Sequence, residues 1–213
     1  MARFSVEVPR CKSCAIALPA DLSMGLRTSP GVCLDCIKQP PQINAVLAAL
    51  DYAYPWSGLI SRYKFGEHPG WAPFFAAVLL KAPGVSQALQ TTDLLLPVPL
   101  SKERLQTRGF NQAWELASAL AKQSGSSAKT DSTLLLRIKN TRPQTELLRQ
   151  ERLANVKGAF QIDPLRVLEI KGKRVILVDD VMTSGASLFT AAHALQAAGA
   201  AHIRGIVLAR TPL

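Results

Sequence analysis

Two adjacent carboxylates and a hydroxyl-rich turn stand next to each other in the last fifth of the sequence. The run from Arg174 to Ser187 reads RVILVDDVMTSGAS. Its aliphatic residues, Val175–Val178, predict a buried strand. We expect that strand to end where Asp179 and Asp180 begin, because two adjacent carboxylates are costly to bury. The sequence therefore predicts both acids at the rim of a sheet.

The turn after the two acids combines hydroxyl groups with small residues at the predicted start of a helix. Backbone N–H groups and the helix dipole converge on an anion at such a point, and small residues let a phosphate approach closely. The acids can accept hydrogen bonds from ribose hydroxyls, or they can order a Mg²⁺ ion that neutralises a pyrophosphate. An ordinary helix cap beside solvated acids is the alternative. The predicted phosphate- and ribose-binding residues are Asp179, Asp180, Thr183, Ser184, Gly185, Ala186 and Ser187.

The four cysteines of the chain form two pairs near its amino terminus. Cys11, Cys14, Cys33 and Cys36 have the spacing C-x2-C-x18-C-x2-C, which is typical of a four-thiolate zinc site. Four thiolates close the shell of a tetrahedral Zn²⁺, so the predicted ion is structural. It would supply folding energy to a segment of ~40 residues that has too little core of its own. Disulfide bonds, which a reducing cytosol disfavours, and an iron–sulfur cluster are the alternatives.

A further group of candidate residues is basic. The chain has 25 Lys and Arg against 15 Asp and Glu, a formal net charge of +10, which favours anionic partners. Lys102, Arg104 and Arg108 follow a predicted strand and would overhang the same sheet edge as the phosphate turn, where they could bind pyrophosphate or a nucleic-acid backbone. A solvated basic face is the alternative. The polar segment 137–158 is either a lid over the site or an ordinary exposed loop, and its Arg152 is a further candidate for binding pyrophosphate or a nucleic-acid backbone.

Strands alternate with helices through most of the chain. Strands are predicted over Asp93–Pro99, Arg174–Val178 and Ile203–Ala209, and helices over Trp56–Phe65, Trp71–Lys81, Gln112–Lys122 and Ala186–Ala198. Asn111 is the expected N-cap of the third helix. The segment Ile43–Tyr54 is too apolar for periodicity to decide between helix and strand. Lys64 and Phe65 either form the floor of the site or end their helix.

The alternation predicts a parallel sheet with helices on both faces, and ligands of such sheets bind at the carboxyl ends of the strands. The pair Pro40-Pro41 suits a joint. We therefore expect a cysteine module over residues 1–41 and an α/β domain over residues 42–213. The sequence contains no apolar run of signal-peptide or membrane-span length, which predicts a cytoplasmic protein.

The acidic turn resembles the phosphoribosyl-pyrophosphate loop of type I phosphoribosyltransferases, in which four apolar residues precede Asp-Asp and a Thr-Thr-Gly-x-Thr turn. Here serine stands for threonine at Ser184 and Ser187, and each hydroxyl is retained. Other motifs together resemble the ComF family of competence-associated proteins over nearly the whole chain. These motifs are the cysteine pairs, Tyr63-Lys64-Phe65, Pro97-Val98-Pro99-Leu100, Arg104 and the run RGFNQA from Arg108 to Ala113.

The resemblance implies a type I phosphoribosyltransferase fold with a small zinc-ribbon-like module at the amino terminus. It also implies a protein that binds phosphoribosyl pyrophosphate, or a related ribose phosphate, and assists the uptake of single-stranded DNA in natural transformation. A DNA-uptake helicase or channel would be its partner. The alternative is an active Mg²⁺-dependent phosphoribosyltransferase of nucleotide metabolism or salvage, with Asp179, Asp180 and Arg108 as catalytic residues.

Overall fold

The computed structural model describes residues 8–19, 31–65, 69–139 and 158–212. Its strands are β1 Ala45–Asp51, β2 Leu94–Pro97, β3 Lys129–Thr130, β4 Leu135–Arg137, β5 Phe160–Ile162, β6 Arg174–Met182 and β7 His202–Arg210. Five of them form one sheet in the order β1-β7-β6-β2-β3, and every neighbouring pair is parallel. β4 and β5 form a separate antiparallel pair. The predicted parallel sheet is confirmed.

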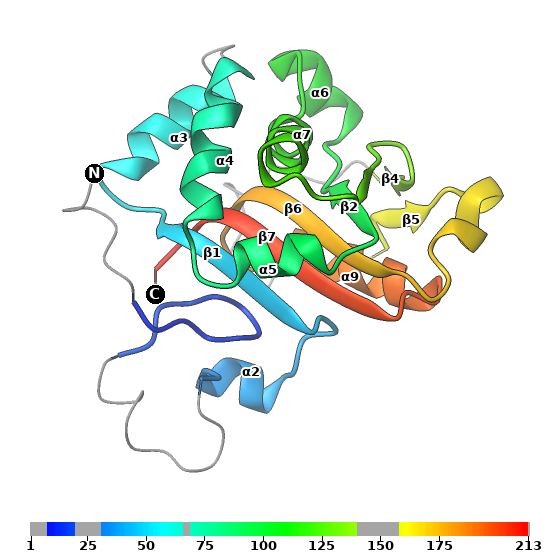
Figure 1. The fold of residues 1–213 in the computed structure, drawn as a ribbon, viewed down its shortest axis with the longest axis horizontal. Coiled ribbons are helices and arrows are strands. Elements are labelled where there is room, and N and C mark those ends of the chain that lie inside the picture. Colours follow the sequence, from blue (N-terminus) through cyan, green and yellow to red (C-terminus); the bar gives the residue numbers. More distant parts are fainter. Residues whose placement is uncertain (1–7, 20–30, 66–68, 140–157, 213) are drawn as a thin grey trace.

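Helices cover both faces of this sheet (Figure 1). One face carries α3, α4, α5 and α7, and the other carries α9. The predicted helices on both faces are therefore confirmed. The helices are α2 Leu34–Lys38, α3 Trp56–Phe65, α4 Ala72–Leu80, α5 Val85–Gln90, α6 Lys102–Arg108, α7 Gln112–Ser124 and α9 Ala186–Ala197, with 3-10 turns at Pro69–Trp71 and Pro164–Glu169.

Successive residues of the central strands are buried in opposite cores. In β6, Ile176 joins the core beneath α3, α4, α5 and α7, whereas Leu177 joins the core beneath α9. Ile206 and Val207 of β7 divide in the same way. Because both faces are covered, the central runs Val175–Val178 and Ile206–Ala209 are apolar, which is why aliphatic runs predicted these strands from the sequence.

The segment Ile43–Tyr54, which periodicity left undecided, contains the edge strand β1. The residues of β1 alternate between buried and half-buried, because successive side chains of a strand point to opposite faces of the sheet. The four predicted helices, all of which follow this segment, are confirmed to within one or two residues at each end. In α7 the buried stripe is made by Ala113, Leu116, Ala117 and Leu120, while Trp114 and Ala121 are only half-buried.

Strand β6 is longer than predicted at its carboxyl end, where the two candidate aspartates lie. It was expected to stop at Val178, but its ladder with β7 continues through Asp179 to Met182. Asp180 is 6% exposed and is not at an open rim. A buried carboxylate needs a partner, and here that partner comes from another helix, as described below.

The amino-terminal cysteine segment packs against the face of the sheet that α9 also covers. The amide of Val46 in β1 donates to the carbonyl of Lys12 at 2.8 Å. Cys11, Cys14 and Cys36 are buried in the same core as Leu188 of α9. The division into a cysteine module over residues 1–41 and an α/β domain over residues 42–213 stays a prediction. Within the described ranges, no helix is both long and apolar enough to cross a bilayer.

Candidate functional site

A cavity of about 450 Å³ lies at the carboxyl ends of β2 and β6. Its walls come from the end of α3, from α6, from the start of α7 and from the first turn of α9. This is the sheet edge at which ligands of parallel α/β proteins bind. Six of the candidate residues line it: Arg104, Arg108, Asp179, Asp180, Thr183 and Ser187.

The other candidate residues lie elsewhere or outside the described part of the chain. Lys102 is exposed at the start of α6 and does not line the cavity. Gly185 and Ala186 are buried beneath the turn, and Ser184 Oγ accepts a hydrogen bond from Ala186 N at 3.4 Å. Arg152 lies outside the described residues, as does nearly all of the predicted lid.

The two carboxylates differ in their surroundings. Asp180 Oδ1 accepts a hydrogen bond from Val181 N at 2.6 Å and lies 3.2 Å from Lys64 Nζ. Asp179 is half-buried, and its Oδ1 accepts a hydrogen bond from Asp180 N at 2.9 Å. Burial first, and the neighbouring Asp180 charge second, raise the pKa of Asp179 to about 7. The carboxyl of Asp179 therefore releases its proton at a higher pH than an exposed aspartate does.

Lys64 is the partner that makes the burial of Asp180 possible. Its side chain is 16% exposed and that of Asp180 is 9% exposed, so the ion pair is largely removed from water. The ammonium group also lies 5.9 Å from the ring centre of Tyr52. Of the two roles considered for Lys64, the structure therefore favours the floor of the site over a simple helix end.

The run from Arg108 to Gln112 joins α6 to α7 at the cavity wall. Gly109 ends α6 with a φ of +75° and Asn111 caps α7, as expected, by accepting a hydrogen bond from Ala113 N at 3.0 Å. The ring of Phe110 lies 6.0 Å from that of Tyr63 in α3. Asn111 Nδ2 also donates to Val98 O, just past β2, at 3.2 Å. Gly109 and Asn111 thus set the end of α6 and the start of α7, and Phe110 packs this connection against α3.

Gln112 is a buried polar centre that links this run to α3. It is 1% exposed, donates through Nε2 to Lys64 O and accepts from Arg108 Nη1 at 3.0 Å. Its own carbonyl accepts the hydroxyl hydrogen of Tyr63 at 2.8 Å. The guanidinium of Arg108 lies 4.8 Å from the ring centre of Phe65. These contacts hold Arg108 and Lys64 beside the same cavity.

The cavity mixes positive and negative groups. Lys64, Arg104, Arg108 and Arg137 line it together with Glu103 and the two aspartates. Burial lowers the pKa of Arg108, and the charge of Asp180 opposes that shift. Such a mixture suits a ligand that carries both phosphate groups and hydroxyls or a bound cation, since each kind of group finds an opposite partner.

The candidate phosphate turn, residues 183–187, depends on Gly185. Its φ is +81°, and a β-carbon at this position would lie 2.5 Å from Met182 Cε and 2.6 Å from Phe189 Cε2. Only glycine fits both the left-handed backbone and the space. The turn therefore brings Thr183 and Ser187 to the cavity while its floor packs tightly against β6 and α9.

Replacing Gly185 by alanine is expected to lower the free energy of unfolding by about 2 kcal/mol or more. The left-handed conformation alone costs an alanine about 1–2 kcal/mol, and the overlap with Met182 and Phe189 adds to it. Gly109→Ala is the matched control, because Gly109 has a similar φ with nothing within 4 Å of the added carbon. Urea unfolding of both variants measures the difference. Equal losses of unfolding free energy in the two variants would show that contacts with Met182 and Phe189 do not exclude a β-carbon at Gly185.

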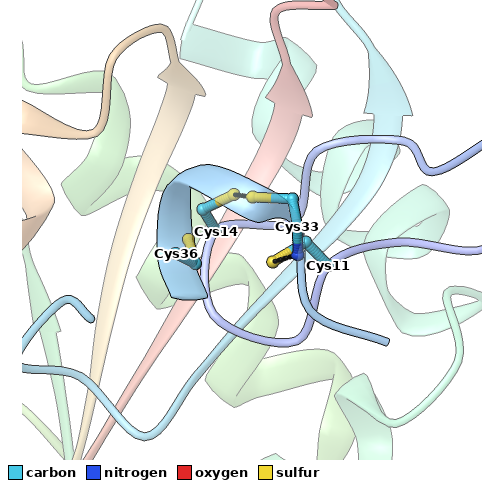
Figure 2. Close-up of side chains that lie close together, drawn as sticks. All are labelled: Cys11, Cys14, Cys33 and Cys36. Carbon is cyan, nitrogen blue, oxygen red and sulfur yellow. Dashed lines mark hydrogen bonds between the residues drawn. The ribbon is translucent and has the colours of Figure 1, made fainter. Parts of the chain in front are cut away.

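The four cysteines form a second site, on the amino-terminal segment. Their sulfur atoms all lie within 4.8 Å of one another, and Figure 2 shows that Cys33 and Cys36 come from the start of α2 while Cys11 and Cys14 come from the facing loop. All four are free thiols. Cys14 Sγ and Cys33 Sγ are 3.7 Å apart, close to the edge of about 3.8 Å that Zn–S bonds of ~2.3 Å give a tetrahedron. The cluster can hold a metal ion such as zinc.

The protonation of these thiols fits the same conclusion. A hydrogen bond with Cys14 lowers the pKa of Cys11 to about 4, while a hydrogen bond with Cys11 and burial raise the pKa of Cys14. Burial also raises the pKa of Cys36 to about 12. Several adjacent thiolates repel one another without a cation between them, and a divalent metal removes that repulsion.

Two sets of contacts at the candidate site were not predicted from the sequence. The ion pair of Lys64 with Asp180 joins residues far apart in the chain, although Lys64 stood among the undecided residues. Arg210 was not considered at all, yet it is 5% exposed and bonds the carbonyls behind the phosphate turn. A charged residue inside the apolar run GIVLAR was the available signal.

Comparisons with known proteins agree on one group of relatives. A family model described as a phosphoribosyl transferase domain matches residues 107–212. DNA utilization protein YhgH of Salmonella typhimurium is 32% identical over 210 residues, which cover 94% of this chain and 90% of that protein. Competence protein F of Haemophilus influenzae is 33% identical over 183 residues, 84% of this chain and 78% of that protein. Competence protein ComFC of Bacillus subtilis is 35% identical over 123 residues, 55% of this chain and 45% of that protein.

Proposed function

The chain belongs to the ComF family of competence and DNA utilization proteins, and from this premise we propose that it binds phosphoribosyl pyrophosphate or a closely related ribose phosphate. The observation that carries the proposal is the cavity in which Asp179 and Asp180 stand beside Thr183 and Ser187. The relatives named as competence proteins support a competence-related role for this protein.

The residues of the cavity divide into three binding tasks. The turn Thr183–Ser187 holds the 5-phosphate through its backbone N–H groups and hydroxyls at the start of α9. Asp179 and Asp180 accept the ribose hydroxyls and hold a Mg²⁺ ion through oxygen atoms, the ligands that this metal prefers. Arg104 and Arg108 bind the pyrophosphate, for which the guanidinium groups offer paired donors.

The cysteine cluster holds a structural Zn²⁺ in this proposal. Its support is the donor set, since four sulfurs within 4.8 Å of one another select a soft or borderline ion and would leave no position for water. The ion organises the amino-terminal segment against the sheet and takes no part in chemistry. An iron–sulfur cluster is the competing occupant, and its visible absorption would identify it.

Titration calorimetry with phosphoribosyl pyrophosphate, with and without Mg²⁺, tests the ligand. We expect binding in the micromolar range that weakens at least tenfold without Mg²⁺, because the pyrophosphate then faces the two aspartates without a cation between them. Ribose 5-phosphate is the comparison ligand and should bind more weakly, since it lacks the pyrophosphate contacts. A wild-type protein that binds neither ligand rejects the proposal.

We extend the proposal to single-stranded DNA, because the relatives are named for DNA utilization and competence. Lys102 is exposed on α6 outside the cavity, so it can contact a DNA backbone that passes over the bound ribose phosphate. The DNA-uptake machinery, a helicase or a channel, would be the partner in a cytoplasmic location.

Lys102→Ala is expected to weaken binding of a single-stranded oligomer without changing the affinity for phosphoribosyl pyrophosphate. Losing one phosphate contact should reduce the slope of log K against log salt by about 0.7. Lys122→Ala is the control, because Lys122 is exposed at the far end of α7. Fluorescence anisotropy at several salt concentrations gives the slopes. DNA binding that does not depend on salt would contradict the backbone contacts.

Catalysis is the second candidate function. Arg104 and Arg108 beside the acids could stabilise the charge on a departing pyrophosphate. In that reaction the bond from ribose C1 to the pyrophosphate oxygen breaks, a new bond from C1 to the acceptor forms, and pyrophosphate leaves. Release of pyrophosphate on mixing the protein, Mg²⁺, phosphoribosyl pyrophosphate and individual purine or pyrimidine bases would distinguish an enzyme from a binding protein.

A further inference from the structure

Arg210 lies between the cysteine cluster and the phosphate turn. It is the last residue of β7 and is 5% exposed. Its Nε donates to Cys14 O at 2.9 Å, and its Nη1 donates to Met182 O at 3.1 Å and to Thr183 O. A guanidinium is costly to bury, and these carbonyl oxygens compensate by accepting its hydrogen bonds. One side chain thus contacts both sites of the protein.

The contacts on the turn side fix the direction of two peptide groups. In a planar trans peptide, the carbonyl oxygen of one residue and the N–H of the next point in opposite directions. When Arg210 holds the oxygens of Met182 and Thr183, the N–H groups of Thr183 and Ser184 must point away from it. Thr183 lines the cavity, so this orientation turns anion-binding donors toward the proposed phosphate position.

The contact on the other side depends on the cysteine cluster. Cys14 contributes both the carbonyl that Arg210 binds and one of the four sulfur atoms. A metal bound by that sulfur fixes the position of the Cys14 peptide. Cys14, Met182 and Ala186 also belong to one buried core, so a displacement of the cysteine loop reaches the floor of the turn by packing as well.

We propose that Arg210 couples the two sites, so that metal occupancy of the cysteine cluster strengthens ligand binding at the phosphate turn. The coupling rests on the proposed ribose-phosphate function and adds a regulation of that site. It must be reciprocal, because linkage requires that the ligand strengthens metal binding by the same factor. Arg210 is a positioning residue, since its partners are carbonyls behind the turn.

Arg210→Gln is expected to weaken binding of phosphoribosyl pyrophosphate by about tenfold, within the usual range of coupling between two sites. Removing the metal from the wild type with a chelator should weaken binding by a similar factor, and the variant should show no further loss. In equilibrium competition with a chromogenic chelator, saturating phosphoribosyl pyrophosphate should reduce zinc release by tightening zinc binding about tenfold in the wild type and not in Arg210→Gln. This second measurement starts from the metal-loaded protein, so it can be interpreted even if the metal-free chain unfolds.

Arg10→Gln is the matched control. Arg10 donates to Ala15 O at 3.1 Å and to Asp51 Oδ1 at 2.9 Å, so it ties the cysteine loop to β1 without contacting the turn. This variant should lose stability but keep the effect of the ligand on zinc release. An unchanged ligand affinity in Arg210→Gln, or zinc release that ignores the ligand in the wild type, overturns the coupling.

Hydrogen exchange separates this proposal from the ligand proposal. The amides of residues 181–187 should exchange faster in Arg210→Gln than in Arg10→Gln, with no ligand present. If the wild type binds no phosphoribosyl pyrophosphate, the ribose-phosphate function fails, and this comparison still decides whether Arg210 holds the turn. Equal exchange in the two variants rejects the role of Arg210.

Discussion

Replacing Cys14 by serine is expected to lower the midpoint of thermal unfolding by about 10 °C or more. Structural zinc sites contribute about 10–16 kcal/mol of apparent binding free energy, and a serine hydroxyl is a poor substitute for a thiolate ligand. A loss of only ~4 kcal/mol shifts the midpoint by about 8–16 °C in a chain of this size. Differential scanning fluorimetry with elemental analysis of zinc measures both consequences.

Ser13→Ala is the control for that variant. Ser13 lies between the two cysteines of the first pair, and the substitution leaves all four sulfur atoms in place. A strong chelator should bring the wild type and Ser13→Ala down to the midpoint of Cys14→Ser, whose own midpoint should not move. A wild-type protein that contains no metal and does not respond to the chelator would contradict a structural metal.

The sequence was sufficient wherever the signal was local. The spacing of the cysteines identified the cluster because two short C-x2-C turns each supply two thiolates without help from the rest of the fold. Strand β6 and its turn were predicted because a strand buried on both faces must be aliphatic throughout and a tight turn into a helix requires glycine. Val175–Val178 and Gly185 meet these conditions by residue type alone.

Helix α6 shows where the local signal fails. Its residues Lys102–Arg108 read KERLQTR, and none of them is buried, so the helix has no apolar stripe for periodicity to detect. It begins where Ser101 Oγ accepts a hydrogen bond from Arg104 N and ends at Gly109. Both caps were visible in the sequence, but a serine and a glycine this close together fit a loop equally well.

The position of Asp180 could not be predicted because it depends on a distant partner. The prediction of an open rim assumed that each carboxylate would be buried without a partner, which costs free energy. Lys64 reaches Asp180 from the end of α3, and the ion pair lets β6 continue past both acids. The contacts of Arg210 were not predicted for the same reason, because its partners are distant in the sequence and come from the cysteine loop and the end of β6.

Replacing Asp180 by asparagine is expected to weaken binding of phosphoribosyl pyrophosphate with Mg²⁺ by about 100-fold. Hydrogen bonds to charged groups contribute roughly 1.5–3 kcal/mol each, and the charge that holds the cation is lost with them. Asp179→Asn should have a similar effect without disturbing Lys64, since Asp180 carries that contact. Calorimetry measures both, and Asp93→Asn, whose carboxylate pairs with Arg174 away from the cavity, is the control. Binding that survives both substitutions would remove the acids from the site.

The pH dependence of Asp179 provides a second, independent measure of the same site. Its pKa is raised from an ordinary value of 3.8 to about 7, so the folded protein binds a proton more tightly than the unfolded chain does. Stability of the ligand-free protein should therefore fall as pH rises through about 7 and be greatest, for this group, below about 4.

Ligand binding should follow the opposite trend. Mg²⁺ favours the ionised carboxylate, so affinity should fall as pH drops below about 7, and proton release on binding should appear in calorimetry in buffers of different ionisation enthalpy. Asp179→Asn should flatten the pH dependence of both stability and affinity. Stability and ligand affinity should thus change in opposite directions with pH, and both changes should disappear in Asp179→Asn. That result requires one carboxylate whose ionisation destabilises the ligand-free fold and whose ionised form binds the ligand.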